Sequence, residues 1–417
     1  MSQLKEMSQE GCAGNVGDRI RVIQLIYQAY LPNQGRYPRV SDQAQILQRA
    51  GCDVTVLACD RDCRHPEQET LEGIEVRRIR VKTRENRGPV GQFLPLLLFA
   101  GRVLRWFEEH AVDALVCHNL DVLPLGLLVR RKTGCKLIFD AHEPNYYALW
   151  PRPLAFMVAL IERLDVALAR RCDAVSVTNG YQIKKYGDAG VRRIALVGNY
   201  TRPALRIDDL DEDKFKSDVT VFGRLGTFYR DVGLEPTLRA FARLHEKVPS
   251  ARLMLGGRVV DTYRAAFERE VSEAEVGPVL DCVGSYDAAR IPDLYRKIHV
   301  SCLVYPRNAW FRNITPTKFF DSISNGVPVI MTDIGGLGDI ITEHRCGIVV
   351  DENDIDAICD AMLRLAKDRE LLIDMARNAL KLRKSVFSWE AMRDAYVKLL
   401  QDVCGSSLGQ VASGTPG

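Results

Sequence analysis

Short apolar runs alternate with helical patterns along most of the chain, and this alternation constrains the fold more than any other feature. Each run is followed by a segment whose apolar residues recur at helical spacing, as in Val40, Ala44 and Leu47. Gly51 then ends that helix before the next run. Buried strands joined by helices build βαβ units with right-handed crossovers. The pattern therefore predicts the α/β class, with parallel sheets covered by helices on both faces.

The alternation occurs in two separate series. The first series of predicted strands lies at 22–27, 54–58, 114–117, 136–139, 174–177 and 194–197. After a polar, acidic stretch at 206–216, the second series lies at 219–222, 252–255, 279–283, 300–304, 327–331 and 347–350. A chain of 417 residues is too long for one ordinary core, so two domains of about 200 residues each are expected.

We therefore predict two Rossmann-like, doubly wound domains that face each other across a cleft. The predicted bounds are 19–203 for the N-terminal domain, 217–387 for the C-terminal domain and 388–404 for a helix that returns toward the N-terminal domain. We expect residues 1–18 to be a disordered extension and the Gly- and Ser-rich residues 405–417 to be a flexible tail. Ligands of open α/β sheets bind beyond the carboxyl ends of the strands, which places the expected site in the cleft.

The composition excludes several classes of protein. Lys and Arg total 57 against 54 Asp and Glu, a net charge of +3 that does not suit a nucleic-acid-binding protein. No long apolar run lacks charges and the first residues do not resemble a signal peptide, so we expect a cytoplasmic protein. The 12 cysteines are scattered, as expected for reduced thiols. Cys59, Cys63 and His65 lack a second ligand pair at a suitable spacing, so we interpret them as a loop and predict no metal site.

The segment 313–330 carries the densest set of candidate binding residues. We expect Thr315 to cap a helix that begins at Pro316, and the free amides of such a terminus attract anions. Lys318 and Asp321 lie three residues apart and share one helix face. There the ammonium group can meet a phosphate and the carboxylate can accept hydrogen bonds from a ribose diol. The segment thus indicates a nucleoside diphosphate site, with an ordinary exposed helix as the alternative.

One further motif follows the first strand in each of the two domains. Gly35 lies in a turn where a residue without a side chain lets backbone amides approach an anion, although a plain loop glycine is the alternative. Arg224 and Arg230, in the segment 223–230, are expected at the carboxyl edge of the second sheet. Both guanidinium groups can fork onto a diphosphate, and solvent-facing arginines are the alternative. His118 ends a buried strand, a position that favours an active-site residue over a core histidine.

The order and spacing of these motifs resemble those of the retaining glycosyltransferases of the GT-B fold, family 4. The resemblance extends from about Arg19 to Val403. The matching pieces are Pro38-Arg39-Val40 with Ala44, Leu47 and Gly51; Asp113 with His118-Asn-Leu-Asp121-Val-Leu-Pro-Leu-Gly126; Asp140-Ala-His142-Glu143; Gly223-Arg224; Pro316-Thr-Lys318 with Asp321 and Gly326-Val-Pro-Val; and Ser388-Trp389-Glu390.

The resemblance implies an enzyme that transfers a hexosyl unit from a nucleoside diphosphate sugar to a hydroxyl acceptor, with retention at the anomeric carbon. It implies a role in glycan, glycolipid or polysaccharide biosynthesis. It implies no metal and no separate cofactor. The N-terminal domain would bind the acceptor and the C-terminal domain the nucleotide sugar. Arg224, Arg230 and Lys318 would stabilise the leaving diphosphate, together with the backbone amides of Ile314 and Thr315.

The resemblance also assigns the sugar, the ribose and the base. The second conserved glutamate of the family falls on Asp321, which would bind the ribose. The first falls on Asn313 near the donor sugar, a departure that leaves the identity of the sugar open, because an amide can both donate and accept. His118 would lie beside the reacting sugar, and the base would pair with main-chain groups of Ser285 and Tyr286. Asp121 and the turn from Asp140 to Glu143 would line the acceptor side.

A stretch from Phe93 to Trp106 mixes apolar residues with Arg102 and Arg105. Such a basic amphipathic stretch can rest on an anionic membrane and receive a lipid-linked glycan acceptor, and core packing of the helix is the alternative. Peripheral contact with the cytoplasmic face of a membrane is therefore one of two interpretations of this stretch, and core packing is the favoured one. Two other functions stay open: a sugar-nucleotide epimerase of the same fold, and a non-catalytic partner subunit that retains the fold.

Overall fold

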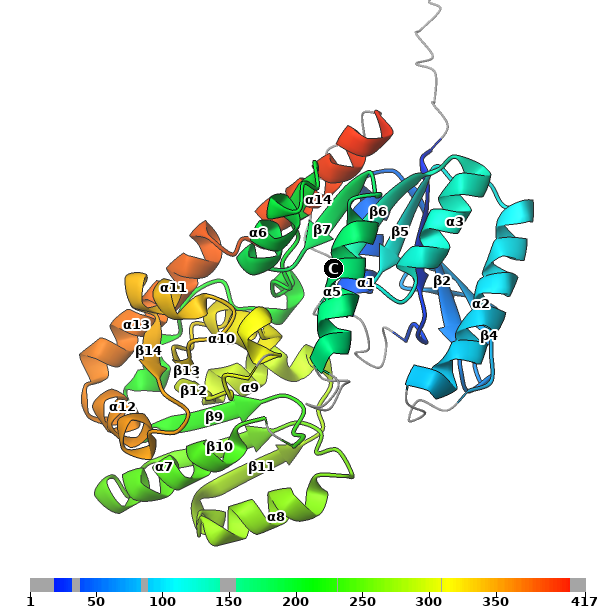
Figure 1. Cartoon of the computed structure of the whole chain (residues 1–417). Helices are drawn as coiled ribbons and strands as arrows, with labels where there is room; N and C mark the ends of the chain where they lie inside the picture. Colours follow the sequence, from blue (N-terminus) through cyan, green and yellow to red (C-terminus); the bar gives the residue numbers. More distant parts are fainter. Residues whose placement is uncertain are drawn as a thin grey trace, which may run out of the picture.

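The computed structural model describes residues 19–31, 38–83, 89–142, 155–230, 232–308 and 310–405. These residues form two α/β domains, each built on one sheet with helices on both faces (Figure 1). The predicted fold class is confirmed. All of the predicted strands form, with ends that differ by a few residues from the prediction.

The N-terminal sheet has eight strands in the order β3-β4-β2-β1-β5-β6-β7-β8. Neighbouring strands are parallel, except that β3 runs antiparallel to β4. The strands are β1 (Arg21–Ile26), β2 (Asp53–Asp60), β3 (Gln68–Leu71), β4 (Ile74–Arg80), β5 (Ala114–His118), β6 (Lys136–Ala141), β7 (Ala174–Val177) and β8 (Ile194–Leu196). The pair β3 and β4 was not among the predicted strands.

Helices cover both faces of this sheet because both faces of its strands are apolar. Ala114 and Val116 of β5 pack into the core on one face, while Leu115 and Cys117 pack into the core on the other. Three helices, α2, α3 and α5, cover the near face in Figure 1. The helices of this domain are α1 (Pro38–Arg49), α2 (Pro89–Glu109), α3 (Leu123–Thr133), α5 (Ala155–Ala169) and α6 (Gly180–Asp188).

The C-terminal sheet has six parallel strands in the order β11-β10-β9-β12-β13-β14. They are β9 (Val221–Leu225), β10 (Arg252–Gly256), β11 (Leu280–Gly284), β12 (Val300–Leu303), β13 (Val329–Thr332) and β14 (Gly347–Val350). The α-helices are α7 (Leu234–Lys247), α8 (Arg264–Glu273), α9 (Ile291–Lys297), α10 (Thr317–Ser324), α11 (Leu337–Glu343), α12 (Ile355–Lys367) and α13 (Arg369–Ser385). Short 3₁₀ helices are η3 (Pro203–Leu205), η4 (Glu212–Phe215), η5 (Gly277–Val279), η6 (Ala288–Arg290) and η7 (Phe311–Asn313).

The last helix, α14 (Trp389–Cys404), leaves the C-terminal domain and packs against α1, β7 and β8 of the N-terminal domain (Figure 1). The Ser388 side chain caps its first turn by accepting a hydrogen bond from the amide of Ala391. Gly405, in the left-handed conformation, ends it.

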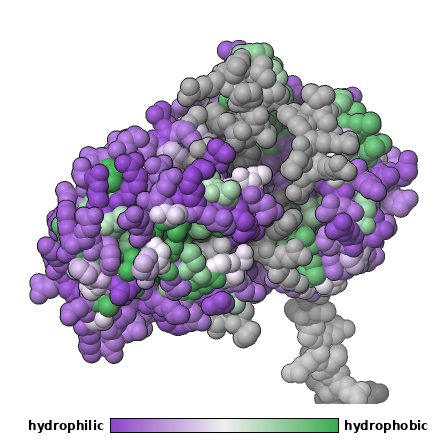
Figure 2. All heavy atoms as spheres, turned by 90° about the horizontal axis from the view of Figure 1, so that it is seen from below, coloured by the Kyte–Doolittle hydropathy of each residue, from purple (hydrophilic) through white to green (hydrophobic). Residues whose placement is uncertain are grey.

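Most of the surface visible in Figure 2 is hydrophilic, with smaller hydrophobic areas over both domains. The large exposed apolar side chains are concentrated on α2 and α5 of the N-terminal domain. None of the described helices combines the length and apolar character that crossing a bilayer requires.

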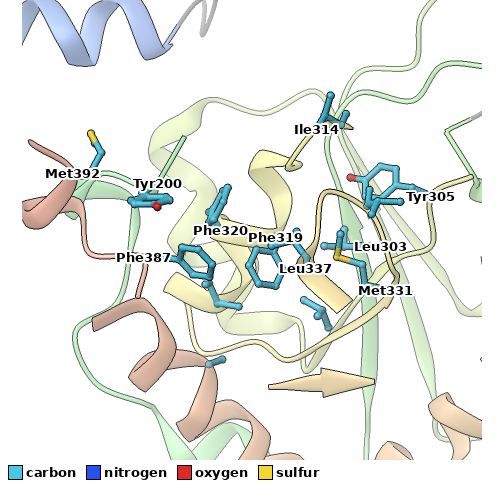
Figure 3. Close-up of a cluster of buried hydrophobic side chains, with 14 of the residues drawn as sticks. Tyr200, Leu303, Tyr305, Ile314, Phe319, Phe320, Met331, Leu337, Phe387 and Met392 are labelled. Carbon is cyan, nitrogen blue, oxygen red and sulfur yellow. The ribbon is translucent and has the colours of Figure 1, made fainter. Parts of the chain in front are cut away.

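Aromatic side chains join the two domains where the interdomain connection meets α10 and the segment before α14 (Figure 3). The centroid of the Tyr200 ring lies 5.1 Å from that of the Phe320 ring and 5.4 Å from that of the Phe387 ring. Phe387 also packs at 5.8 Å against Phe319. These rings belong to one continuous core that includes residues of both sheets.

Candidate functional site

A pocket of about 330 Å³ opens beyond the carboxyl edge of the C-terminal sheet. Its walls come from the end of β9 and the loop after it, from the loop after β12, and from the start of α10. Arg224 and Lys318 both line it, so two predicted site cations share one pocket. The remaining wall is largely aromatic and comprises Phe228, Tyr229, Tyr305, Trp310 and Phe311.

Two glycines allow the pocket loops to approach each other. Gly226 and Gly257 both have φ +138°, a conformation that residues with a side chain rarely adopt. A Cβ atom on Gly257 would lie 1.6 Å from the carbonyl oxygen of Gly226. A Cβ atom on Gly226 would lie 3.3 Å from Cε of Lys318. The wall of the pocket therefore depends on backbone that only glycine fits.

The helix that carries Lys318 starts one residue later than predicted. Pro316 is extended, with ψ 130°, and occupies the N-cap position, so α10 begins at Thr317 and no side chain caps it. The predicted cap residue Thr315 is buried, and its hydroxyl has no partner among the described residues. The cap prediction was wrong because Pro316 takes an extended rather than a helical conformation.

Lys318 and Asp321 form an ion pair, with Nζ 2.9 Å from Oδ2. Burial alone would lower the pKa of Lys318, but the Asp321 carboxylate, Tyr286 and Tyr295 together raise it above its usual range. Thr201, in the interdomain connection, donates to the other carboxylate oxygen of Asp321 at 3.0 Å. A carboxylate offers about four lone-pair positions, so these two bonds leave Asp321 able to accept from a diol.

The guanidinium of Arg224 faces the protein rather than only the pocket. Its Nη2 donates to the carbonyl of Val232 at 2.6 Å, and its Nη1 lies 3.4 Å from the carbonyl of Cys302. The group also stacks over the Tyr305 ring at 4.8 Å from the centroid. We expected the N–H groups of Arg224 to point at a diphosphate. In this structure they donate to backbone carbonyls instead, so that expectation is corrected.

The other candidates near the pocket have different surroundings. Arg230 is exposed in the turn after β9 and is not among the residues that line the pocket. Ile314 lines the pocket, but its amide points back to the carbonyl of Phe311 at 3.4 Å, so it is not the free donor that we expected. Asn313 is half-buried at the end of η7. Gly35 lies outside the described residues.

The turn after β11 brings Tyr286 close to the ion pair. Burial raises the pKa of Tyr286, while the nearby Lys318 lowers it and Asp321 raises it. Its ring lies over Gly256, since a Cβ atom there would be 3.4 Å from Cε1 of the tyrosine. Ser285 beside it is exposed. The turn predicted to bind the base therefore lies next to the residues predicted to bind the phosphate and the ribose.

The N-terminal domain has its own buried polar cluster at the carboxyl ends of β5 and β6. Asp140 accepts two hydrogen bonds from Arg39, with Oδ2 2.9 Å from Nε. Ser176 donates to Asp140 as well. Burial would raise the pKa of Asp140, but Arg39 and the neighbouring histidines hold it well below its usual range. The carboxylate is therefore ionised and fixed in place.

His118 lies inside this cluster and is only 1% exposed. Its Nδ1 is 2.9 Å from Oδ2 of Asp140, and its Nε2 is 3.1 Å from the side-chain amide of Gln24. Burial lowers the pKa of His118 to about 4, so the ring is neutral. The prediction that His118 faces a reacting sugar is corrected in this structure, because both ring nitrogens are occupied within the core. His142, whose side chain is 16% exposed, is the outer member of the cluster.

Ring nitrogens of His118 and His142 and a carboxylate oxygen of Asp140 lie within 4.8 Å of one another, as metal ligands do. A cation here would adjoin the guanidinium of Arg39, which already pairs with both oxygens of Asp140. Arg39 therefore already balances the negative charge of Asp140, and the cluster suits this ion pair better than a metal ion. In the loop after β2, His65 pairs with Asp60 at 3.2 Å, while Cys63 contacts the carbonyl of Asp60.

A hydrogen bond connects the two domains near both polar clusters. The side chain of Asn179, the N-cap of α6, donates to the carbonyl of Asn313 at 3.1 Å. Asn179 also accepts from the amide of Gln182, whose side chain donates to the carbonyl of His142 at 2.6 Å. The side chains of Asn179 and Gln182 thus link the backbone of His142 to the loop before α10 across the interdomain junction.

Two family models match the chain in succession. Residues 35–199 match the glycosyl transferase 4-like domain, and residues 207–382 match the glycosyl transferases group 1.

The chain belongs to the group 1 glycosyltransferases. Solved structures agree on the GT-B fold: the sucrose-phosphate synthase of Thermosynechococcus elongatus superposes with a TM-score of 0.76 at 18% identity, covering 93% of this chain and 100% of that one. Anabaena HepE in complex with UDP and glucose superposes with a TM-score of 0.70 at 14% identity, covering 92% of this chain and 100% of that one.

Curated relatives of this glycosyltransferase include enzymes of known activity. The lipopolysaccharide core biosynthesis mannosyltransferase LpsB of Rhizobium meliloti is 25% identical over 313 residues, which cover 71% of this chain and 82% of the relative. A GDP-mannose-dependent phosphatidylinositol monomannoside mannosyltransferase of Mycobacterium tuberculosis is 21% identical over 290 residues, which cover 60% of this chain and 74% of the relative. The predicted enzyme class, a glycosyltransferase, is confirmed.

Several contacts that shape the site of this glycosyltransferase were not predicted. Arg39 and Asp140 are 101 residues apart in sequence, and no local pattern indicates their pairing. Thr201 lies in a connection without a motif. Gly257 is the one case with a usable signal, because a pair of glycines directly after a predicted strand indicates close backbone approach.

Proposed function

We propose that this glycosyltransferase moves a hexosyl unit from a nucleoside diphosphate sugar to a hydroxyl acceptor, with retention at the anomeric carbon and without a metal. The observation that carries the proposal is the convergence of Arg224, Lys318 and the start of α10 on one pocket, with Asp321 and Tyr286 beside it. One site therefore contains a suitable group for the phosphates, for the ribose and for the base of a nucleotide sugar.

The charge of the pocket supports departure of a diphosphate. Negative charge grows on the diphosphate as the bond to the sugar breaks, and cations fixed in advance stabilise that charge. Lys318 stays protonated because its raised pKa lies above any physiological pH. Among the described residues that line the pocket there is no Asp or Glu to serve as a covalent nucleophile. We therefore propose attack on the face that the diphosphate leaves, with a donor phosphate oxygen taking the proton of the acceptor.

The relatives indicate which donors to test first. One relative is described as GDP-mannose-dependent and another as a mannosyltransferase, while HepE was solved with UDP-glucose. Nothing in the described base turn chooses between these, because main-chain groups of Ser285 and Tyr286 can serve either base. GDP-mannose and UDP-glucose are the two leading candidates for the donor.

We further propose a lipid-linked acceptor at the cytoplasmic face of a membrane. One face of α2 packs into the core through Phe99 and Val103, as the core-packing alternative predicted. Its other face exposes Phe93 and Leu94, each 64% exposed. On α5, Phe156 and Leu160 are exposed as well.

Both helices begin after the carboxyl ends of strands, β4 for α2 and β6 for α5, so these apolar side chains lie at the edge where the cleft opens. The exposed Arg105 lies further along α2, where the exposed Glu108 and Glu109 offset its charge, so the proposal rests on the apolar side chains.

The direct test is a turnover screen with GDP-mannose, UDP-glucose and their epimers, using soluble and lipid-linked glycans as acceptors and EDTA as a control. We expect release of nucleoside diphosphate that depends on an acceptor, an α-linked product from an α-linked donor, and no loss with EDTA. A new epimer formed without acceptor would favour the epimerase. Absence of both binding and turnover with every donor would favour the non-catalytic subunit.

A further inference from the structure

We propose that Thr201, in the connection between the two domains, is a positioning residue for the donor. Its hydroxyl holds the Asp321 carboxylate in the orientation that accepts hydrogen bonds from the ribose diol. This inference rests on the proposed function, which assigns the ribose to Asp321. It makes the interdomain connection part of the nucleotide site.

Thr201 and Asp321 form a buried hydrogen bond. The hydroxyl oxygen of Thr201 lies 3.0 Å from Oδ1 of Asp321, and the two residues are 6% and 8% exposed. A carboxylate that pairs with Lys318 only accepts hydrogen bonds, so the hydroxyl proton must point at Asp321. A bond of this kind, to a charged group and shielded from water, is stronger than one between neutral groups at the surface.

This bond and the ion pair together fix the plane of the carboxylate. Lys318 donates to Oδ2 at 2.9 Å while Thr201 donates to Oδ1, so each oxygen is held by one donor. With only one oxygen held, the group could turn about its bond to Cβ, because this terminal torsion of aspartate is broad. Each carboxylate oxygen has about two lone-pair positions and so keeps one for a ligand. Two such positions in one fixed plane suit the two neighbouring hydroxyls of a ribose.

The connection is attached to α10 on both sides of Thr201. Before it, the ring centroid of Tyr200 lies 5.1 Å from that of Phe320 in α10 (Figure 3). After it, the side-chain nitrogen of Asn325, at the end of α10, donates to the carbonyl of Leu205 at 3.1 Å. Thr201 is therefore held in place by its neighbours as well as by its own bond, as a positioning residue must be.

The next residue ties the same segment to the N-terminal domain. Nε of Arg202 lies 2.9 Å from Oδ1 of Asp42 in α1. Consecutive residues of the connection thus contact the donor site and the other domain. A donor from within the C-terminal domain would leave ribose binding independent of the connection, whereas Thr201 makes ribose binding depend on it.

Calorimetry on the full-length protein tests this role by comparing nucleotides with and without the ribose diol. Thr201→Val removes the hydroxyl and should weaken the binding of GDP or UDP by about 5- to 20-fold, the range of a hydrogen bond. The affinity for the corresponding 2′,3′-dideoxynucleoside diphosphate should change by less than about 2-fold, since it lacks the groups that Asp321 binds. Thr201→Ser keeps the hydroxyl and should bind GDP or UDP within about 3-fold of the wild type. Thr220→Val is the matched control, because Thr220 is 1% exposed and precedes β9, at the opposite edge of the sheet from the pocket.

Melting temperatures without nucleotide test the contact itself. Thr201→Val should lower the melting temperature of the wild type, but much less that of Asp321→Ala, because there the hydroxyl has already lost its partner. Equal weakening of both kinds of nucleotide by Thr201→Val, no weakening of either, or additive losses in melting temperature would each overturn the inference. If the wild type binds neither kind, or both equally well, the ribose site of the proposed function fails instead. The melting temperatures then decide by themselves whether Thr201 holds Asp321.

Discussion

Arg224 and Arg230 follow the same strand but differ in what surrounds their guanidinium groups. Arg224 is buried and donates to backbone carbonyls, so it positions the loops that form the pocket. Arg230 is exposed, and no described residue forms an ion pair with it. A diphosphate can recruit Arg230 without breaking an existing contact, whereas recruiting Arg224 requires that it give up a carbonyl.

Substitution of the two arginines should therefore have different signatures. Arg230→Ala should lower the transfer rate by about one to two decades while leaving the free energy of unfolding within about 0.5 kcal/mol of the wild-type value. Arg224→Ala should lower both, because buried carbonyls lose their donor. Steady-state kinetics combined with urea unfolding measures both quantities. Arg224→Ala with wild-type stability, or Arg230→Ala with wild-type turnover, would contradict this division of roles.

At the scale of single residues, the sequence predicts contacts between residues that lie close together along the chain. Lys318 and Asp321 are three residues apart on one helix, so their proximity follows from helical geometry. The contact of Thr201 with Asp321 and that of Arg39 with Asp140 join residues separated by 120 and 101 positions. Only the assembled fold brings such groups together. The same limit explains His118, because its enclosure depends on Gln24 from a different strand.

Among the elements, the strand ends β9 and β10 determine the shape of the pocket. Their loops touch through Gly226 and Gly257, where the amide of Gly226 donates to the carbonyl of Gly256 at 2.8 Å. The positive φ of both glycines and the backbone contact leave no space for a methyl group.

We expect Gly257→Ala to destabilise the protein by at least about 3 kcal/mol, because the new Cβ meets a backbone oxygen and the residue is strained. Any folded fraction should bind nucleoside diphosphate poorly, since the loop that contacts Lys318 must shift. Gly277→Ala is the matched control: nothing lies within 4 Å of its Cβ position, and it should cost less than about 1 kcal/mol. Differential scanning fluorimetry distinguishes the two, and equal melting temperatures would contradict the argument.

The elements that the sequence does not predict have weak local patterns. Strand β3 is polar and partly exposed, and β4 alternates arginine and glutamate with apolar residues, so neither shows the continuous apolar run of a buried parallel strand. Central strands such as β5 and β13 are buried along their whole length, which is why their composition identifies them, whereas the edge strands β8, β11 and β14 are more exposed. The start of α10 was misplaced because Pro316 suits both the N-cap and the first helical position.

For the whole molecule, the aromatic junction couples the two domains. Phe387 contacts Tyr200, Phe319 and Phe320, so it joins the interdomain connection, α10 and α14 (Figure 3). Phe387→Ala should cost about 2 to 4 kcal/mol of unfolding free energy by leaving a cavity. Val386→Ala, next to it but 44% exposed, should cost less than about 1 kcal/mol. Guanidinium unfolding of both variants is the measurement, and a Phe387→Ala protein as stable as Val386→Ala would exclude the junction as a structural link.

Acid should destabilise the protein through two buried neutral histidines. Burial lowers the pKa of His118 and of His299 to about 4 each. In the unfolded chain the pKa of a histidine is about 6.5. Between this pH and the folded-state pKa of about 4, the unfolded chain binds more protons than the folded protein, so the free energy of unfolding falls as the pH falls. Each histidine contributes at most about 1.4 kcal/mol per pH unit in this window. Urea unfolding at pH 7 and pH 5 should show the loss, and His299→Asn should roughly halve it. Stability that is constant between these two pH values would rule out burial of the neutral rings.

The central claim is that Lys318, next to Asp321, binds the diphosphate of a nucleotide sugar. Isothermal titration calorimetry with GDP and UDP, on the wild-type protein and on Lys318→Ala, tests it most directly. We predict that at least one of the two nucleotides binds with one-to-one stoichiometry and that Lys318→Ala weakens this binding by about 10- to 100-fold, as expected for a charge-assisted bond. Equal affinity in the two folded proteins, or no binding of either nucleotide to the wild type, would contradict the account.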